Sequence, residues 1–128
     1  MSWKWVNRPA LVTLHDMSLA EHGGASGIRD QGLLESALAR PENLAAYGEP
    51  DHASLAASYG VGLANNHAFV DGNKRVALLS VGLFLFKNGY KLNATQTEAT
   101  LAMLGVASGD LDEAAFADWM RTHSAVRA

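Results

Sequence analysis

Apolar residues recur mostly at helical spacing along this chain, so the pattern predicts an all-α fold. We expect about six helices packed around one buried central helix, in a single domain that spans residues 1–128. The first helix is predicted at about residues 9–22, with Pro9 in its first turn and Gly23 and Gly24 at its end.

Two further helices are predicted before the middle of the chain. Residues 33–38 predict a short helix that stops before Pro41, because the residue that precedes a proline disfavours helical geometry. Residues 41–50 contain two prolines and Gly48, and therefore predict a loop. The next helix is expected at about residues 51–66.

The central helix is predicted at residues 73–88, with Gly89 as its C-cap. It is apolar on nearly every side, which is typical of a helix that others enclose. Any strands are expected to be confined to residues 28–30, in a Gly-rich loop or short hairpin, and to residues 90–92.

Two capping boxes predict where the last two helices begin. Thr95 with Glu98 opens one helix, and Asp110 with Glu113 opens the other by analogy with the Ser/Thr form. The expected core positions of these helices are Leu101, Leu104, Phe116, Trp119 and Met120.

Composition narrows the class of protein and of partner. The 128 residues are 48% hydrophobic and 18% charged, as in a globular domain, and the formal net charge of −3 argues against direct nucleic-acid binding. Cysteine is absent, which excludes disulfides and thiolate zinc sites. The most apolar window, at residues 76–86, is shorter than the about 20 residues that span a bilayer. We therefore expect a cytoplasmic protein without membrane contact.

Candidate chemistry is concentrated in residues 67–75, directly before the predicted central helix. The first main-chain N–H groups of a helix have no intrahelical partners, and together with the helix dipole they attract anions. Gly72 lets a phosphate come close because it has no Cβ, and Asn73 follows it at the helix start. Lys74 and Arg75 add positive charge, so the segment predicts a phosphate-binding site.

Two further side chains of this segment suit group transfer. His67 is a candidate general base for a hydroxyl, and Asp71 is a candidate ligand for Mg²⁺ shared with phosphate oxygens. Phe69 is expected to point inward and anchor the loop. An anion site, a metal ligand and a base are together what phosphoryl or nucleotidyl transfer requires.

Each of these residues also has an ordinary structural explanation. Asp71-Gly72 is a common turn, and His67 on its own is more often a histidine at a helix end or in a packed interior. Asn73 is a common helix cap, and Lys74-Arg75 fits a solvated surface. The functional interpretation therefore depends on all of them occurring within nine residues.

The segment resembles the signature of the Fic/Doc superfamily in its Doc form, H-x-F-x-D-(A/G)-N-K-R. The resemblance covers about residues 9–122. Its other supports are residues typical of death-on-curing proteins, at 27–30, 32–41, 84–85 and 88–90.

The resemblance implies a toxin of a type II toxin–antitoxin pair, neutralised by the disordered C-terminal segment of a Phd-like antitoxin. It implies a kinase that moves the γ-phosphate of ATP to a threonine of elongation factor Tu and stops translation. It makes His67 the general base and Asp71 the ligand of Mg²⁺. The phosphates would contact Gly72, Asn73, Lys74 and Arg75.

Most Fic proteins instead transfer AMP, through the motif H-P-F-x-(D/E)-G-N-G-R-x-x-R. This chain has Lys74 where that form has its second glycine, and Leu78 where it has its second arginine. Lys74 fills room that a diphosphate would occupy in the AMP-transfer pose, and without the arginine a phosphate clamp is lost. Both departures favour phosphate transfer, whereas Ala68 in place of proline is a minor change.

Residues outside the motif receive weaker assignments. Ile28, Arg29 and Asp30 lie where Fic-fold proteins carry a flap that holds the target segment, although a plain surface loop is an equal alternative. His15 and His22, on the first predicted helix, are most simply explained as packed or surface histidines. No inhibitory helix of the (S/T)-x-x-x-E-(G/N) type occurs in the sequence, so we expect inhibition by a separate polypeptide.

Three hypotheses follow. The first is a Doc-like kinase toxin, the second is a Fic-type AMP transferase, and the third is a non-catalytic module that binds a nucleotide or a partner. Lys74 and Leu78 argue against AMP transfer. The presence of both His67 and Asp71 argues against a pure binder, which needs no base.

Overall fold

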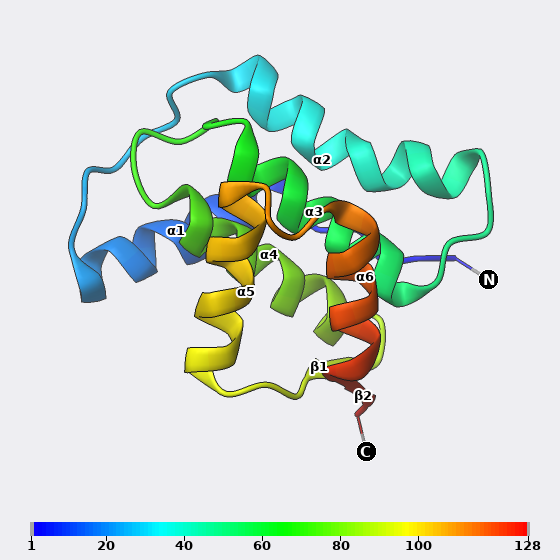
Figure 1. The fold of residues 1–128 in the computed structure, drawn as a ribbon. Helices are drawn as coiled ribbons and strands as arrows, with labels where there is room; N and C mark the ends of the chain where they lie inside the picture. Colours follow the sequence, from blue (N-terminus) through cyan, green and yellow to red (C-terminus); the bar gives the residue numbers. More distant parts are fainter. Residues whose placement is uncertain (1, 128) are drawn as a thin grey trace.

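The computed structural model describes residues 2–127 and confirms the all-α fold (Figure 1). Within these residues the chain forms six helices and a small two-stranded sheet. The elements are α1 (Arg8–His22), α2 (Gln31–Ala46), α3 (His52–Asn65), α4 (Asn73–Lys87), β1 (Tyr90–Leu92), α5 (Gln96–Ser108), α6 (Glu113–Thr122) and β2 (Ser124–Val126).

The centre of the fold is shared by two helices, α3 and α4. The helix α3 contacts α2, α4, α5 and α6, and a continuous stretch from Leu55 to Gly60 is buried on it. The helix α4 packs on α3 and also meets α1, α5 and β1. One side of α4 stays partly open, at Leu78, Leu79 and Leu83, so it is central without being enclosed all round. Its C-cap is Asn88, one residue before the predicted Gly89.

The helix α2 is longer than predicted, because it continues through Pro41 to Ala46 instead of ending before the proline. A proline inside a helix removes one main-chain hydrogen bond and costs about 3 kcal/mol. Pro41 is buried on the same side as Leu34, Ala37 and Leu38, and α2 packs on α3 through Gly62, which lies close to Ala37. The burial of this face offsets the lost bond, so the predicted loop begins only at about residue 47.

The last two helices differ in how well they were predicted. The capping box of Thr95 and Glu98 is present. The second box, Asp110 with Glu113, is not the cap of α6: Asp112 is the N-cap, and its carboxylate accepts from the Ala115 N–H at 2.8 Å. The cap lies later in the chain because residues 109–111 turn back on α5, where the Leu111 N–H donates to the Gly105 carbonyl.

The buried side of α5 is formed by Ala99, Ala102, Met103 and Val106. Leu101 and Leu104 lie off this stripe and are 63% and 47% exposed, so the prediction that they belong to the core was wrong. The predictions for Phe116 and Met120 were correct, since both are fully buried, and Trp119 is half-buried against the core. The exposed leucines of α5 therefore need another explanation.

The sheet was half predicted. The expected strand at residues 90–92 is β1, and it pairs antiparallel with β2, which was not predicted. The expected strand at 28–30 is reduced to an isolated antiparallel bridge between Ile28 and Phe69. None of the described helices is long and apolar enough to cross a membrane.

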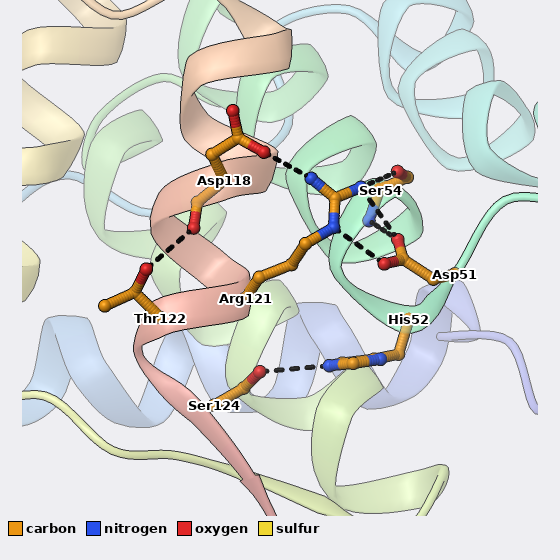
Figure 2. A network of polar contacts seen from close by, with 7 residues as sticks. All are labelled: Asp51, His52, Ser54, Asp118, Arg121, Thr122 and Ser124. Atoms are coloured by element: carbon orange, nitrogen blue, oxygen red, sulfur yellow. Dashed lines mark hydrogen bonds and ion pairs between the residues drawn. The ribbon is translucent and has the colours of Figure 1, made fainter.

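The helix α6 is tied to the start of α3 by one arginine (Figure 2). Arg121 donates to both carboxylate oxygens of Asp51, at 2.7 and 3.1 Å, and also to Ser54 and Asp118. Asp51 is itself the N-cap of α3 and accepts from the Ser54 N–H. The hydrogen bond from Arg121 is the main reason that the pKa of Asp51 is lowered to about 2. This network fixes one end of α3, whose other end leads into the candidate site.

Candidate active site

The predicted motif forms the loop between α3 and α4 and the first turn of α4. Asn66 ends α3, and its side-chain amide donates to the Leu33 carbonyl at 2.7 Å. Gly72 is the N-cap of α4 and has a φ of 76°, a left-handed conformation that favours glycine. The loop is thus held at both ends, and α4 begins where the sequence predicted.

Asn73 fixes the shape of this loop. Its side-chain oxygen accepts from the Phe69 N–H at 3.0 Å, and its side-chain nitrogen donates to the Phe69 carbonyl at 3.1 Å. Phe69 is 2% exposed, which confirms that it anchors the loop inward. The Asn73 side chain therefore braces the loop, and among the described residues its main-chain N–H has no partner and can donate to a phosphate.

The segment of residues 23–30, which we call the flap, lies along the motif loop. The Val70 N–H donates to the Gly27 carbonyl at 3.0 Å, and the N–H groups of Arg29 and Asp30 donate to the Ala68 carbonyl. Ile28 packs against the core, and the Asp30 carboxylate caps α2. The flap residues predicted to dock a target are therefore beside the motif, and two of them also have structural roles.

The candidate metal ligand Asp71 is held by main-chain groups. Its Oδ1 accepts from the Gly72 N–H at 2.8 Å, and its Oδ2 accepts from the Ala25 N–H of the flap at 3.2 Å. A Cβ on Gly24 would lie 2.9 Å from Oδ2 of Asp71, so only glycine lets the flap approach so closely. Sequence reasoning missed this contact, although the Gly-rich stretch was its visible signal.

The candidate base His67 is exposed and adopts a φ of 53°. Among the described residues it is the only one other than glycine with a positive φ. Such a conformation costs free energy, and it persists only where surrounding contacts hold it. The side chain of Arg29 supplies one, since its Nε donates to the His67 carbonyl at 2.7 Å.

The start of α4 carries N–H groups and cationic side chains that have no partner among the described residues. Within residues 2–127, no hydrogen bond is formed by the main-chain N–H groups of Asn73, Lys74 and Arg75. The side chains of Lys74 and Arg75 are exposed, and neither forms an ion pair with another described residue. These groups fit an anion such as a phosphate, because the helix dipole and both cations act in the same direction.

A groove of about 830 Å³ opens at this point between α1, α4 and α5. Its polar end is formed by residues 71–75, and its walls by apolar residues of the three helices, among them Leu14, Leu78, Leu83 and Leu104. Of the described residues, His67 and the flap lie outside this lining. The groove is large enough for a nucleotide or for one face of a peptide helix.

His15 lies beneath the motif, on the inner side of α1. It is 1% exposed, and its ring meets the Phe69 ring edge-on with centroids 4.5 Å apart. Burial lowers the pKa of His15, against smaller opposite effects of the Asp16 carboxylate and the Asp71 backbone. The interpretation of both as packed or surface histidines is confirmed, because His15 is packed and His22 is exposed at the groove.

The donor set fits Mg²⁺ better than a metal held by protein ligands alone. Within the described residues, no group of three or more His, Asp or Glu side chains could hold a metal ion. Mg²⁺ commonly binds to one or two carboxylates together with substrate phosphates and water. Asp71, next to a free helix N-terminus, matches this arrangement.

Comparison with known proteins agrees with this geometry. The Fic/DOC family matches residues 5–85. The chain is 37% identical to "Protein kinase doc" of Escherichia phage P1 over 112 residues, which cover 87% of this chain and 88% of that protein. It is 45% identical to "Toxin Doc" of Mycolicibacterium smegmatis over 75 residues, which cover 56% of this chain and 57% of that protein. The chain therefore belongs to the Fic/DOC family, and its identification as a Doc-type member is confirmed.

Proposed function

We propose that this protein is a toxin that transfers the γ-phosphate of ATP to a hydroxyl group of another protein. The observation that carries the proposal is the start of α4. Among the described residues, its first N–H groups and the side chains of Lys74 and Arg75 have no partner, and they line a groove beside the loop that carries the exposed His67. Relatives named a protein kinase and a toxin support the same activity.

Each residue has a definite task in the proposed reaction. His67 takes the proton from the attacking hydroxyl, which is a contribution of about 10²–10⁴ in rate for a well-placed base. Lys74, Arg75 and the N–H groups of α4 stabilise the negative charge of the transferred phosphate. Asp71 and the phosphates would hold Mg²⁺, which would neutralise charge on the phosphates as the bond to the departing ADP breaks.

Phosphate transfer is favoured over AMP transfer by two residues of α4. Lys74 is exposed at the polar end of the groove, and Leu78 lines its wall one turn later. A leucine at that position leaves the groove without the second arginine that clamps a phosphate in the AMP-transfer motif. We therefore assign the γ-phosphate as the group transferred.

The acceptor that we propose is a threonine of elongation factor Tu in the cytoplasm, so that transfer would stop translation. The flap at Ile28, Arg29 and Asp30 is proposed to position the acceptor segment, because it lies directly along the motif loop that carries His67. Of these three, Arg29 is the residue with an exposed side chain that neither caps a helix nor packs on the core.

We propose that the groove also binds the C-terminal segment of a Phd-like antitoxin. Its apolar walls include Leu79, Leu83 and Leu104, and Leu104 is 47% exposed. An amphipathic helix that enters such a groove buries its apolar face on these leucines. Leu104→Glu should therefore weaken binding of a Phd-like C-terminal peptide about tenfold or more, and unchanged binding would rule out this wall.

The transfer reaction is tested by labelling a bacterial lysate that contains added elongation factor Tu. ATP carries the label on the γ-phosphate in one reaction and on the α-phosphate in the other, and His67→Ala is the control enzyme. We expect label on the elongation factor from the γ-position only, and none with the variant. Label from the α-position would mean AMP transfer, and no label from either would favour a binding module.

A growth assay tests the toxin assignment separately. Expression of the wild type should arrest growth, and expression of His67→Ala should not, since the variant lacks the proposed base. If both proteins are harmless, or both are toxic, the assignment as a catalytic toxin fails.

A further inference from the structure

The imidazole of His15 is buried at a place where an apolar ring could pack equally well. It lies one helical turn from Leu11 and one from Leu19, which are both buried on the same side of α1. Neither ring nitrogen has a partner with the geometry of a hydrogen bond within residues 2–127, although the Asp71 backbone lies close to the ring. A buried polar group without a partner destabilises the fold, so such groups are rare in native proteins.

The ring is oriented toward the turn that begins α4. A Cβ on Gly72 would lie 2.9 Å from Cε1 of His15, and 3.7 and 3.8 Å from its two nitrogens. The edge of the ring that carries both nitrogens therefore faces Gly72. The other contact, with Phe69, is a T-shaped aromatic packing at 62° that phenylalanine could also make.

Sites where a sequence breaks the rules of burial are often sites of function. The unpaired nitrogens lie under Asp71 and Gly72. Asp71 is the candidate metal ligand, and Gly72 is the N-cap that precedes the first free N–H groups of α4. A small movement of this turn would bring a main-chain group of the turn within hydrogen-bond reach of the ring.

We propose that His15 is a positioning residue for the transfer reaction. When Mg²⁺ and ATP bind, the His15 ring makes a hydrogen bond to the main chain of the Asp71–Gly72 turn and holds it in the shape that binds the phosphates. The inference rests on the proposed function, because it concerns the same phosphate site.

The test compares two substitutions with a matched control. His15→Phe keeps the ring and its contact with Phe69 but removes both nitrogens, whereas His15→Gln keeps a polar group that can reach the turn. His52→Phe is the control: His52 is half-buried, stacks on Tyr90 and bonds to Ser124, away from the motif. The full chain is used for each, and two quantities are measured: the midpoint of thermal unfolding and the binding of Mg²⁺–ATP by calorimetry.

We expect His15→Phe to unfold at the same or a higher temperature than the wild type, since it removes a costly buried polar group. Its affinity for Mg²⁺–ATP should nevertheless fall about tenfold, the effect of one hydrogen bond to a site. His15→Gln should be less stable than His15→Phe but should bind Mg²⁺–ATP more tightly. The control His52→Phe should bind as the wild type does.

If His15 had only a structural role, a variant of unchanged or higher stability would not bind Mg²⁺–ATP more weakly than the wild type does. If His15→Phe lowers stability and affinity together, or binds Mg²⁺–ATP as the wild type does, the inference is wrong. If His15→Phe does not fold, its stability already contradicts the proposal. If the wild type itself binds no Mg²⁺–ATP, the proposed function fails first, and this result is distinct from the others.

Discussion

The Nε of Arg29 donates a hydrogen bond of 2.7 Å to the main-chain carbonyl of His67. The two residues are 38 positions apart, and the bond joins the flap to the candidate base. His67 has a φ of 53°, so its backbone is in a conformation that an ordinary residue seldom adopts. The arginine therefore helps to hold the base in a strained position, in addition to any contact with an acceptor.

Replacement of Arg29 should lower the rate of transfer without changing ATP binding. Arg29→Ala removes the bond to His67, and we expect kcat to fall about tenfold while KM for ATP stays the same. Arg29→Lys should not restore the rate, because a lysine has no Nε–H at that place in the side chain. Steady-state kinetics measure both constants.

The control for Arg29 is Arg8→Ala, which removes a half-buried arginine at the start of α1. Arg8 pairs with Glu35 and lies outside the motif and the flap. Its replacement should leave kcat unchanged. A rise in KM for ATP in Arg29→Ala, with kcat intact, would show that Arg29 binds phosphate instead of positioning His67.

Replacement of His67 should separate chemistry from binding. His67→Ala should reduce kcat by about 10²–10⁴, as expected for a lost general base, and should leave the affinity for Mg²⁺–ATP within about threefold. The reason is that the proposed phosphate contacts are at the start of α4, which lines the groove, whereas His67 lies outside that lining. Calorimetry and the labelling assay give the two values, and an equal loss of both would contradict the base assignment.

Replacement of Asp71 should act on metal-dependent binding. Asp71→Asn keeps an oxygen that can accept from Gly72 or Ala25 but removes the negative charge that Mg²⁺ requires. ATP should then bind with about the same affinity with and without Mg²⁺, whereas the wild type should bind more tightly with Mg²⁺. Asp16→Asn, an exposed change on α1, is the control and should keep the dependence on Mg²⁺.

Local sequence patterns predicted the start of a helix correctly where a capping residue or a glycine determines the backbone conformation. Thr95 with Glu98 and the residues around Asp51 and Gly72 define helix starts that hardly depend on the rest of the fold. Pro41 shows the limit, because the free energy of burying α2 on α3 exceeds the local cost of a proline. Leu101 shows another limit, since the helices that pack against α5 determine which of its sides is buried.

The motif residues could be predicted because they are adjacent in the sequence, and the structure keeps them on one loop and one helix turn. The contacts that hold them come from distant segments: Ala25 on Asp71, Arg29 on His67, and His15 beneath Gly72. All three contacts involve main-chain atoms, which carry no signature in a sequence. The spacing of four between Leu11, His15 and Leu19 was a visible signal that His15 is buried.

The ion pair between Arg121 and Asp51 should make stability depend on pH in the acid range. The pKa of Asp51 is about 2 in the folded protein, against an ordinary value of 3.8. Because the folded pKa is lowered, the stabilisation is complete above about pH 4 and is lost as the pH falls through about 2. Both side chains are 42% exposed, so solvent screens the pair, and we expect a contribution of only about 1 kcal/mol.

Urea unfolding of Arg121→Met and Asp51→Asn at several pH values measures this contribution. Both variants should be about 1 kcal/mol less stable than the wild type near pH 6, and the difference should shrink toward zero near pH 2. Asp51→Asn still caps α3, since an asparagine side chain also accepts from the Ser54 N–H. Asp51→Ala loses both the cap and the ion pair, so it should cost about 1 kcal/mol more than Asp51→Asn. A difference between wild type and Arg121→Met that does not change with pH would mean that Arg121 stabilises α6 by packing alone.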